Sequence, residues 1–220
     1  MIDVILDSAI YLKNPHLDDA SFKALVKLCK NSQTQLHIPF IVEQEFISDI
    51  LAGYEKHINS MDYALDSLFK EQLPTTVRGI LATTNHSMAE VSVKVSQWLR
   101  DGFDKWAVNI KADRMPLATD HAGRVLNSYF LGLVPFESKK SHKDISGSFF
   151  YEAVKDVAAT SEVLYLVVGD EALNESCREL NKAKVLKSLE ELIELDEFQS
   201  LLKGQLRIGN QNMSEMFICE

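Results

Sequence analysis

The strongest structural signal in this chain is the stretch VLYLVVGD, residues 163–170. Six consecutive apolar residues that end at Gly169 and Asp170 are typical of a buried strand in a parallel sheet. The stretch IDVIL, residues 2–6, follows the same pattern near the start of the chain and ends at Asp7. Two such runs, each followed by an acid, predict parallel strands that carry Asp7 and Asp170 at their carboxyl ends.

Segments with helical periodicity lie between and beyond these strands. Apolar residues recur at three- and four-residue steps in each segment, which predicts amphipathic helices. The predicted helices lie at about 17–29, 41–50, 145–159 and 188–203, and a second short strand lies at 35–38. Strands that alternate with helices predict a three-layer α/β fold with a mostly parallel central sheet.

Residues from about 54 to 140 interrupt this alternation, because they show helical periodicity with few strand signals. No repeat or low-complexity linker divides the chain, so we expect one domain over residues 1–220 that contains a helical insertion. Apolar stripes such as Val91, Val95 and Trp98 need a partner surface. They predict that the insertion packs on the α/β core and overhangs the acidic strand ends.

The composition excludes several classes of protein. Hydrophobic residues make up 46% of the 220 residues and charged residues 25%, which is typical of a globular chain and excludes extensive disorder. Three cysteines without metal-ligand spacing exclude a disulfide scaffold. The chain lacks both a run of about 18 apolar residues and the layout of a signal peptide, so we expect a cytosolic protein without a membrane segment.

The formal net charge of −9 weighs against a partner that is held by phosphate contacts alone. The charge is unevenly distributed, however. Residues 91–143 contain nine basic and five acidic residues, a balance of +4, which leaves −13 for the rest of the chain. This modest basic excess is compatible with solvated helix faces and also with a surface for nucleic acid.

Four acids fall at or beside the predicted strand ends: Asp7, Glu45, Asp144 and Asp170. Carboxylates that converge without matching bases repel one another, so such a set is tolerable mainly when a divalent cation neutralises it. Mg²⁺ or Mn²⁺ is the natural ligand of an all-oxygen set. Each acid taken singly is also explained as a helix cap or a solvated charge.

At this point the sequence resembles the PIN-domain nucleases, in particular the larger bacterial members with a helical insertion. The resemblance rests on the order of four stretches along nearly the whole chain: IDVILDS, HIPFIVEQEF, YFLGLVPFESKKSHKDISGSFFYEAV and VLYLVVGDEAL. It implies metal-dependent hydrolysis of RNA phosphodiester bonds, with Mg²⁺ or Mn²⁺ held by Asp7, Glu45, Asp144 and Asp170. Glu43 is the alternative to Glu45.

One departure from the family pattern concerns Gly147, which stands where the family has an Asp. The resemblance then leaves two alternatives: Asp144 carries the third-ligand role alone, or the site is weakened or inactivated. In the second case the chain is a PIN-like scaffold that binds RNA or a protein partner without cleavage. A phosphatase of the haloacid dehalogenase type is disfavoured, because Ala9 stands where it needs a second acid.

The expected substrate is RNA, with single-stranded DNA as the alternative. Arg114 and Lys143 are the predicted substrate contacts among the basic residues of the insertion. PIN-domain proteins of this kind often resemble toxins or defence effectors that another protein inhibits. The resemblance therefore implies an inhibitory or complex-forming protein partner, and it leaves a homo-oligomer open.

Overall fold

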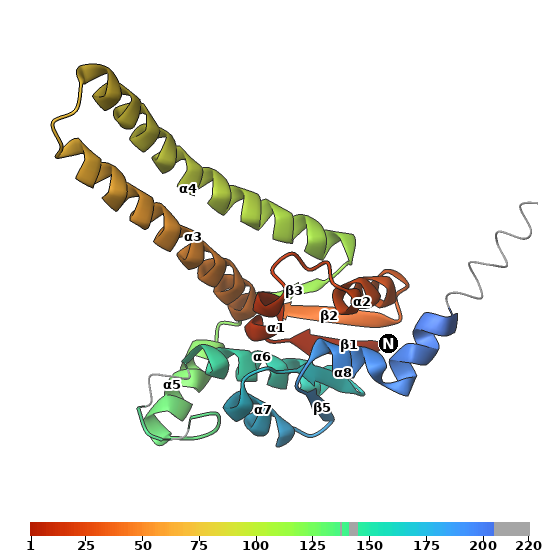
Figure 1. Cartoon of the computed structure of the whole chain (residues 1–220). Helices are drawn as coiled ribbons and strands as arrows, with labels where there is room; N and C mark the ends of the chain where they lie inside the picture. Colours follow the sequence, from red (N-terminus) through yellow and green to blue (C-terminus); the bar gives the residue numbers. More distant parts are fainter. Residues whose placement is uncertain (137, 141–144, 205–220) are drawn as a thin grey trace, which may run out of the picture. The chain divides into compact units, whose positions relative to one another are not determined.

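A computed structural model describes residues 1–136, 138–140 and 145–204 (Figure 1). The chain forms two compact units. The first, here called the α/β unit, comprises Met1–Glu43 and the chain from Ala107 onward. The second, here called the arm, comprises Gln44–Trp106.

The α/β unit is built on a five-stranded sheet with the order β3-β2-β1-β4-β5. All neighbouring strands are parallel, which confirms the predicted sheet type. The strands are β1 (Ile2–Leu6), β2 (Thr34–Pro39), β3 (Asp113–Met115), β4 (Leu164–Val167) and β5 (Ala183–Leu186). The chain builds outward from β1 on one side and returns to build on the other, so the topological switch point lies between β1 and β4.

Helices cover both faces of this sheet and give the predicted three layers. The helices are α1 (Ser8–Lys13), α2 (Ala20–Lys30), α5 (His121–Leu131), α6 (Ile145–Thr160), α7 (Glu171–Arg178) and α8 (Leu189–Glu194). α2 packs against β2 and α8, whereas α6 packs against α5 and α7. Right-handed crossovers of a parallel sheet place these two groups of helices on opposite faces.

The centre of the core is the pair β1 and β4, whose register joins Val4 to Tyr165 and Leu6 to Val167. These four side chains are at most 1% exposed. Strands buried on both faces explain why the sequence shows continuous apolar runs there instead of alternation. The β1–β4 pair is therefore a rigid base for the residues that follow each strand.

Capping residues set most helix starts in the α/β unit. Asp19 caps α2 by accepting from the Phe22 N–H at 2.8 Å, and Ser188 caps α8 by accepting from the Glu191 N–H at 3.2 Å. The helix predicted at 188–203 is interrupted, because α8 ends at Glu194 and helical structure resumes over 196–204. α1 gives no helical signal in the sequence, because its six residues are too few to show helical periodicity.

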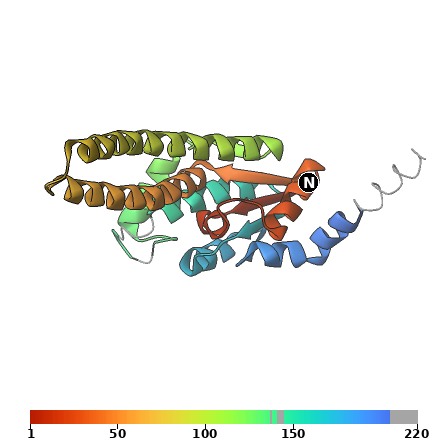
Figure 2. The same cartoon turned by 45° about the horizontal axis from the view of Figure 1, so that its top comes forward.

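The arm consists of two long helices, α3 (Phe40–Phe69) and α4 (Thr75–Asn109), joined by a short turn at Pro74. Figures 1 and 2 show them running side by side in opposite directions. The insertion predicted at about 54–140 differs from this unit at both ends. α3 runs without a break from the α/β unit into the arm, and 113–115 form a strand that is too short for its alternation to show in the sequence.

The residues expected to lie in covered apolar stripes differ in exposure, and Val95 is half-buried. Val91 is 42% and Trp98 is 61% exposed. The packing of the arm on the α/β core stays a prediction. Over the described ranges of the chain, no helix is both long and apolar enough to cross a membrane.

Candidate functional site

Asp7 follows β1 directly, and the chain around it holds its carboxylate in place. Oδ1 accepts from the Ile10 N–H at 3.0 Å and caps α1, while Oδ2 accepts from the Gly169 N–H at 2.7 Å. The Asp170 N–H donates to the same Oδ2 at 3.4 Å. The Asp7 carboxylate therefore joins the ends of β1 and β4 at the switch point of the sheet.

Burial raises the pKa of Asp7, which is 4% exposed. The backbone N–H groups of Gly169, Ile10 and Asp170 and the charge of Lys13 oppose this increase. The net direction is upward, so the folded chain disfavours the charged form of Asp7. A cation beside this carboxylate would favour the charged form again.

Asp170 caps the other helix at this edge of the sheet. Its Oδ1 accepts from the Leu173 N–H at 2.8 Å and starts α7, and the residue itself is exposed. A Cβ at Gly169 would lie 3.3 Å from the Cβ of Ala9, which is a tight contact. The glycine in the GD pair thus lets α1 approach the end of β4 and brings Asp7 next to the Asp170 backbone.

The side chain of Tyr11 on α1 is fully buried. Burial raises the pKa of the Tyr11 hydroxyl most, and the charges of Cys29, Asp7 and Glu43 raise it further. Both acids thus act electrostatically on the Tyr11 hydroxyl. Glu43 is the alternative to Glu45 in the predicted ligand set.

Glu43 is held by Arg114 from β3. The guanidinium Nε donates to Glu43 Oε2 at 2.9 Å, and Nη2 donates to Oε1. The Glu43 side chain is 12% exposed and that of Arg114 is 40% exposed. The structure therefore gives Arg114, predicted as a substrate contact, a positioning role for Glu43. The sequence offered no signal for this pair, because its members lie 71 residues apart.

For the remaining predicted site residues, proximity to Asp7 and Asp170 stays a prediction. Asp144 and Lys143 lie outside the described residues. Glu45 belongs to the arm and not to the α/β unit. Among the residues that the structure describes, no group of three or more His, Cys, Asp or Glu side chains is arranged to hold a metal ion.

The two acids at the switch point nevertheless have the chemistry that a divalent cation requires. Each carboxylate oxygen has two lone pairs, so Asp7 Oδ1 keeps acceptor capacity beyond the one bond from the Ile10 N–H. Oxygen donors suit Mg²⁺ and Mn²⁺. The upward shift in the pKa of Asp7 is also what a neighbouring cation would reverse. The chemistry of these two acids therefore fits such an ion, and their role as its ligands stays a prediction.

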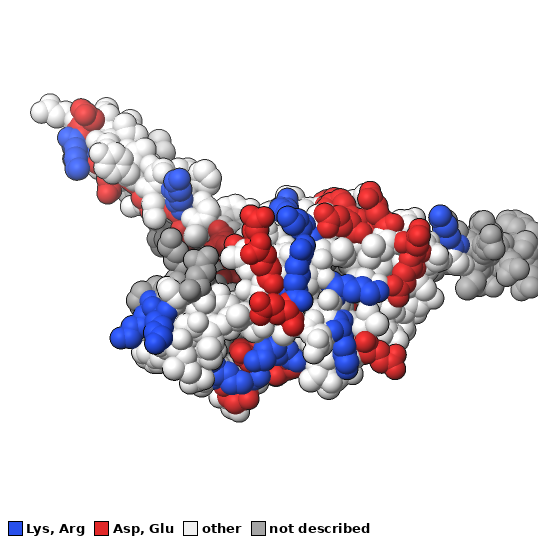
Figure 3. All heavy atoms as spheres, turned by 90° about the horizontal axis from the view of Figure 1, so that it is seen from below, with Lys and Arg blue, Asp and Glu red and all other residues white. Residues whose placement is uncertain are grey.

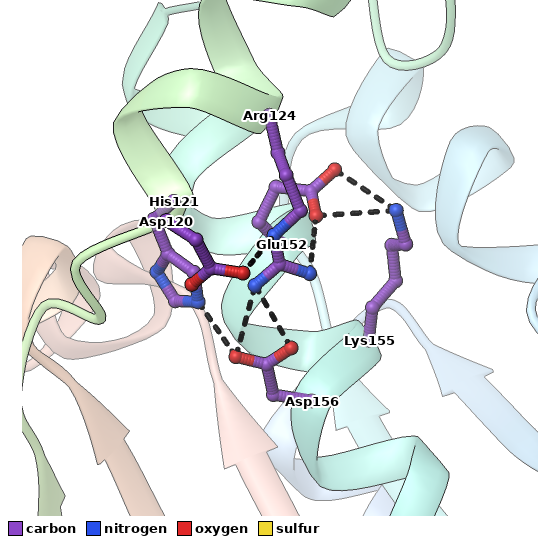
Figure 4. A network of polar contacts seen from close by, with 6 residues as sticks. All are labelled: Asp120, His121, Arg124, Glu152, Lys155 and Asp156. Atoms are coloured by element: carbon purple, nitrogen blue, oxygen red, sulfur yellow. Dashed lines mark hydrogen bonds and ion pairs between the residues drawn. The ribbon is translucent and has the colours of Figure 1, made fainter.

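Another polar cluster in the α/β unit joins α5 to α6 (Figure 4). Arg124 lies between two acids of α6: Nη1 is 2.9 Å from Glu152 Oε2, and Nη2 donates to Asp156 Oδ1 at 3.0 Å. His121 Nε2 lies 2.7 Å from Asp156 Oδ2, and Lys155 Nζ donates to Glu152 at 3.0 Å. Each acid has cationic partners, so we interpret this cluster as a structural clamp.

Both ring nitrogens of His37 on β2 are likewise engaged by acids. Its Nδ1 lies 2.8 Å from Asp113 Oδ2 and its Nε2 lies 2.9 Å from Asp3 Oδ1. This cluster ties β2 to both of its neighbours in the sheet. Asp3 is therefore a structural acid.

The charges on one face of the molecule are mixed. Figure 3 shows Lys and Arg side chains interleaved with Asp and Glu side chains over the described part of this face. A surface of alternating sign does not attract a polyanion as a continuous basic surface does. On this face, the described residues therefore provide no broad electrostatic footprint for nucleic acid.

Comparisons with known proteins give one match. A family model described as PIN domain matches residues 4–172, which is most of the chain and includes both Asp7 and Asp170. Neither the curated proteins nor the solved structures contain a match to this sequence.

Proposed function

This chain belongs to the PIN-domain family, whose members are typically nucleases, and from that premise we propose that it is a metal-dependent endoribonuclease. The observation that carries the proposal is the meeting of Asp7 and the Asp170 backbone at the switch point of the sheet. Ligands of open parallel sheets bind at such a point, outside the carboxyl ends of the strands. Hydrolysis of nucleic acid needs no covalent nucleophile there.

In the proposed site, Asp7 and Asp170 hold Mg²⁺ or Mn²⁺ together with Asp144 and Glu45, or with Glu43 in place of Glu45. The bound ion supplies an activated water and neutralises charge that develops on the phosphate. Asp7 is oriented by the N–H groups of Ile10 and Gly169.

The proposed substrate contacts are Arg114 and Lys143, which hold the sugar–phosphate backbone and carry no sequence information. Arg114 is 40% exposed at its side chain while it pairs with Glu43. It can therefore present part of its guanidinium to a phosphate and hold Glu43 at the same time. We infer single-stranded RNA as the substrate, with single-stranded DNA as the alternative.

The direct test measures cleavage of a single-stranded RNA with Mg²⁺ or Mn²⁺ by the wild type and by Asp170→Asn. Asn caps a helix about as well as Asp, so this variant keeps the Leu173 cap and loses one charged ligand. We expect cleavage to fall at least ~100-fold, the upper end of what outer-shell partners of a metal cost.

Asp19→Asn is the matched control. Asp19 caps α2 with a bond of the same length, 2.8 Å, and we assign it no part in the site. Cleavage by Asp19→Asn should equal that of the wild type. Equal activity of the wild type and Asp170→Asn would contradict the proposed ligand set.

A second candidate function, a PIN-like scaffold that binds RNA or a protein without cutting, is favoured by one observation. Gly147 occupies the first turn of α6, where the family has an acid. A Cβ at this position would lie 3.7 Å from Leu173 Cδ1, an ordinary contact, so a side chain fits there. The glycine is thus not required by packing, and Gly147→Asp should fold.

The Gly147→Asp variant separates the two candidates. If the wild type has a weakened site, Gly147→Asp should cleave RNA in the same assay faster than the wild type does. A wild type that already cleaves at the rate of Gly147→Asp would show that Asp144 suffices. RNA binding without cleavage by both forms would favour the scaffold.

The proposed biological role is that of a toxin or defence effector under the control of an inhibitory protein. Expression in a bacterial host tests it. An active Gly147→Asp form should arrest growth, and its Asp170→Asn derivative should not. Harmless expression of a form that cleaves RNA in vitro would contradict the role as a general toxin.

A further inference from the structure

The two helices of the arm contain almost no core. Among the side chains that the structure describes between Ile47 and Leu99, none is buried. α3 and α4 approach one another closely at few points. Two helices of this length that bury so little apolar surface would not be stable by themselves, because packing supplies most helical stability in proteins. The arm therefore needs a further surface to cover it.

The apolar residues of both helices repeat every seven residues. One row on each helix is half-buried and forms the inner rows: Leu51, Ile58 and Leu65 on α3, and Leu81, Met88 and Val95 on α4. A second row on each helix is exposed and forms the outer rows: Tyr54, Met61 and Leu68 on α3, and Val77, Val91 and Trp98 on α4, where the polar Thr84 occupies the position between Val77 and Val91. Alternating steps of three and four residues between the two rows are the pattern of a left-handed coiled coil.

A coiled coil buries both of its apolar rows, whereas this hairpin half-buries one and exposes the other. Residues of the outer rows are between 38% and 61% exposed, with Val77 and Trp98 at the two limits. A surface that packs on the outer rows must therefore carry a matching apolar repeat along both helices. A second copy of the same hairpin carries that repeat at the same spacing.

The charges beside the outer rows favour the same occupant. Of the residues that directly follow an outer-row residue, Glu55 and Asp62 in α3 are acidic and Arg78 in α4 is basic. The other three are uncharged: Phe69, Ser92 and Leu99. Asp62 Oδ1 is buried and accepts no hydrogen bond among the described residues. A two-fold axis that sets α3 of one copy beside α4 of the other brings acidic and basic flanks together.

The net charge of the arm disfavours nucleic acid as the occupant. Residues 44–106 contain nine acidic and six basic residues, a balance of −3. The face of the hairpin is about 30 Å long and ~20 Å wide, a projected area of ~600 Å². Side chains protrude from this plane, so the accessible area of the face is larger than its projection. It approaches the ~800 Å² per partner that stable protein interfaces bury.

We propose that the arm is a dimerisation element, in which the outer rows of two copies of this chain pack together as a four-helix coiled coil. The dimer forms without nucleic acid and without metal. This inference is therefore independent of the proposed cleavage, and either one can fail while the other holds.

The test is the sedimentation of the full chain under reducing conditions across a range of micromolar concentrations. The wild type should show twice the monomer mass of 24.8 kDa. Val91→Lys places a charge in the outer row, and in a two-fold dimer it does so twice. We expect its dimer dissociation constant to rise at least ~10-fold.

Val93→Lys is the matched control, because Val93 lies two residues further along α4 on another face and is 68% exposed. The two substitutions have the same intrinsic effect on the helix, so any difference between them belongs to the interface. Circular dichroism should show equal helix content in both variants. Val93→Lys should dimerise as the wild type does.

The charged flank gives a second, independent measurement. Glu55→Arg, at an exposed position beside Tyr54, should weaken the dimer, and Arg78→Glu in the same chain should restore it, because the flanks then pair with exchanged signs. A wild type that stays monomeric overturns the proposal, even if it binds another protein. A dimer that is insensitive to Val91→Lys, or equally sensitive to Val93→Lys, overturns it as well.

Discussion

The α/β unit and the arm differ in how far they bury their apolar side chains. In the α/β unit the strands β1 and β4 are covered on both faces, and residues such as Leu6 and Leu166 are fully buried. In the arm the apolar rows lie at the surface, as Met61 at 50% and Trp98 at 61% exposure illustrate.

The ion pairs of the two units differ in burial as well, and those of the α/β unit are the more buried. Glu152 in the α/β unit is buried and bound by cations from two helices. Glu90 in the arm pairs with Lys94 one turn away on its own helix, at 57% and 77% side-chain exposure. The α/β unit therefore holds acids such as Glu152 in place with its own cations. The arm, in contrast, needs a partner surface to cover its apolar rows.

The largest expected effect is the loss of core packing in the α/β unit. Leu166→Ala deletes a fully buried side chain and should lower the free energy of unfolding by ~2–5 kcal/mol. Leu68→Ala, the same substitution at a leucine of the arm that is 46% exposed, should cost less than ~1 kcal/mol in dilute solution.

Urea unfolding followed by circular dichroism measures both values. A second series at higher protein concentration is the control, because the proposed dimer would add to the cost of Leu68→Ala there. Similar costs for the two substitutions in dilute solution would mean that the arm has a core of its own, and the comparison would fail.

A smaller difference in the free energy of unfolding is expected when two glutamates, one in each unit, are replaced by glutamine. Each of them pairs with a lysine about one turn further along its own helix. Glu152→Gln removes a charge that is 4% exposed and that Arg124 and Lys155 surround. Removing one partner of a buried ion pair destabilises strongly, and the partial exposure of both cations reduces the cost here to ~1–3 kcal/mol.

Glu90→Gln in the arm is the matched substitution. Exposed pairs on a helix contribute little, so the free energy of unfolding should change by less than ~0.5 kcal/mol. Equal effects of the two substitutions in urea unfolding would show that the α5–α6 clamp does not stabilise the α/β unit.

The sequence predicted the parts of the fold whose signal is local. The continuous apolar runs before Asp7 and Asp170 predicted the parallel strands correctly, because strands buried on both faces need no alternation. Residue type and position favour an N-cap at Asp18 or Asp19 and another at Ser188, and the structure shows Asp19 and Ser188 as the caps. The three-layer α/β class followed from the order of these elements.

Ion pairs between residues far apart in the chain could not be predicted from the sequence. No periodicity links Glu43 to Arg114, or Arg124 to Glu152, because each pair meets only once the sheet and its helices are assembled. The end of the insertion was misplaced for a related reason. Its helical pattern continues into α5, and the three-residue strand β3 between them shows no alternation.

The smallest expected effect is the response of the two units to acid, and it rests on Asp156 in the α5–α6 clamp. Burial alone would raise the pKa of Asp156, but hydrogen bonds from His121 and Arg124 outweigh it and hold the pKa below its usual value. A depressed carboxyl pKa adds stability that is present above the unfolded value of about 3.9 and is lost as the pH falls below it. Because the Asp156 side chain is 40% exposed, we expect this contribution to be less than ~1 kcal/mol.

Asp156→Asn should lower the urea midpoint at neutral pH and flatten its decline below about pH 5. Asp66→Asn, in the exposed part of the arm, is the matched control and should leave both unchanged. If the decline in acid is as steep in Asp156→Asn as in the wild type, the clamp is not the acid-sensitive part of the α/β unit.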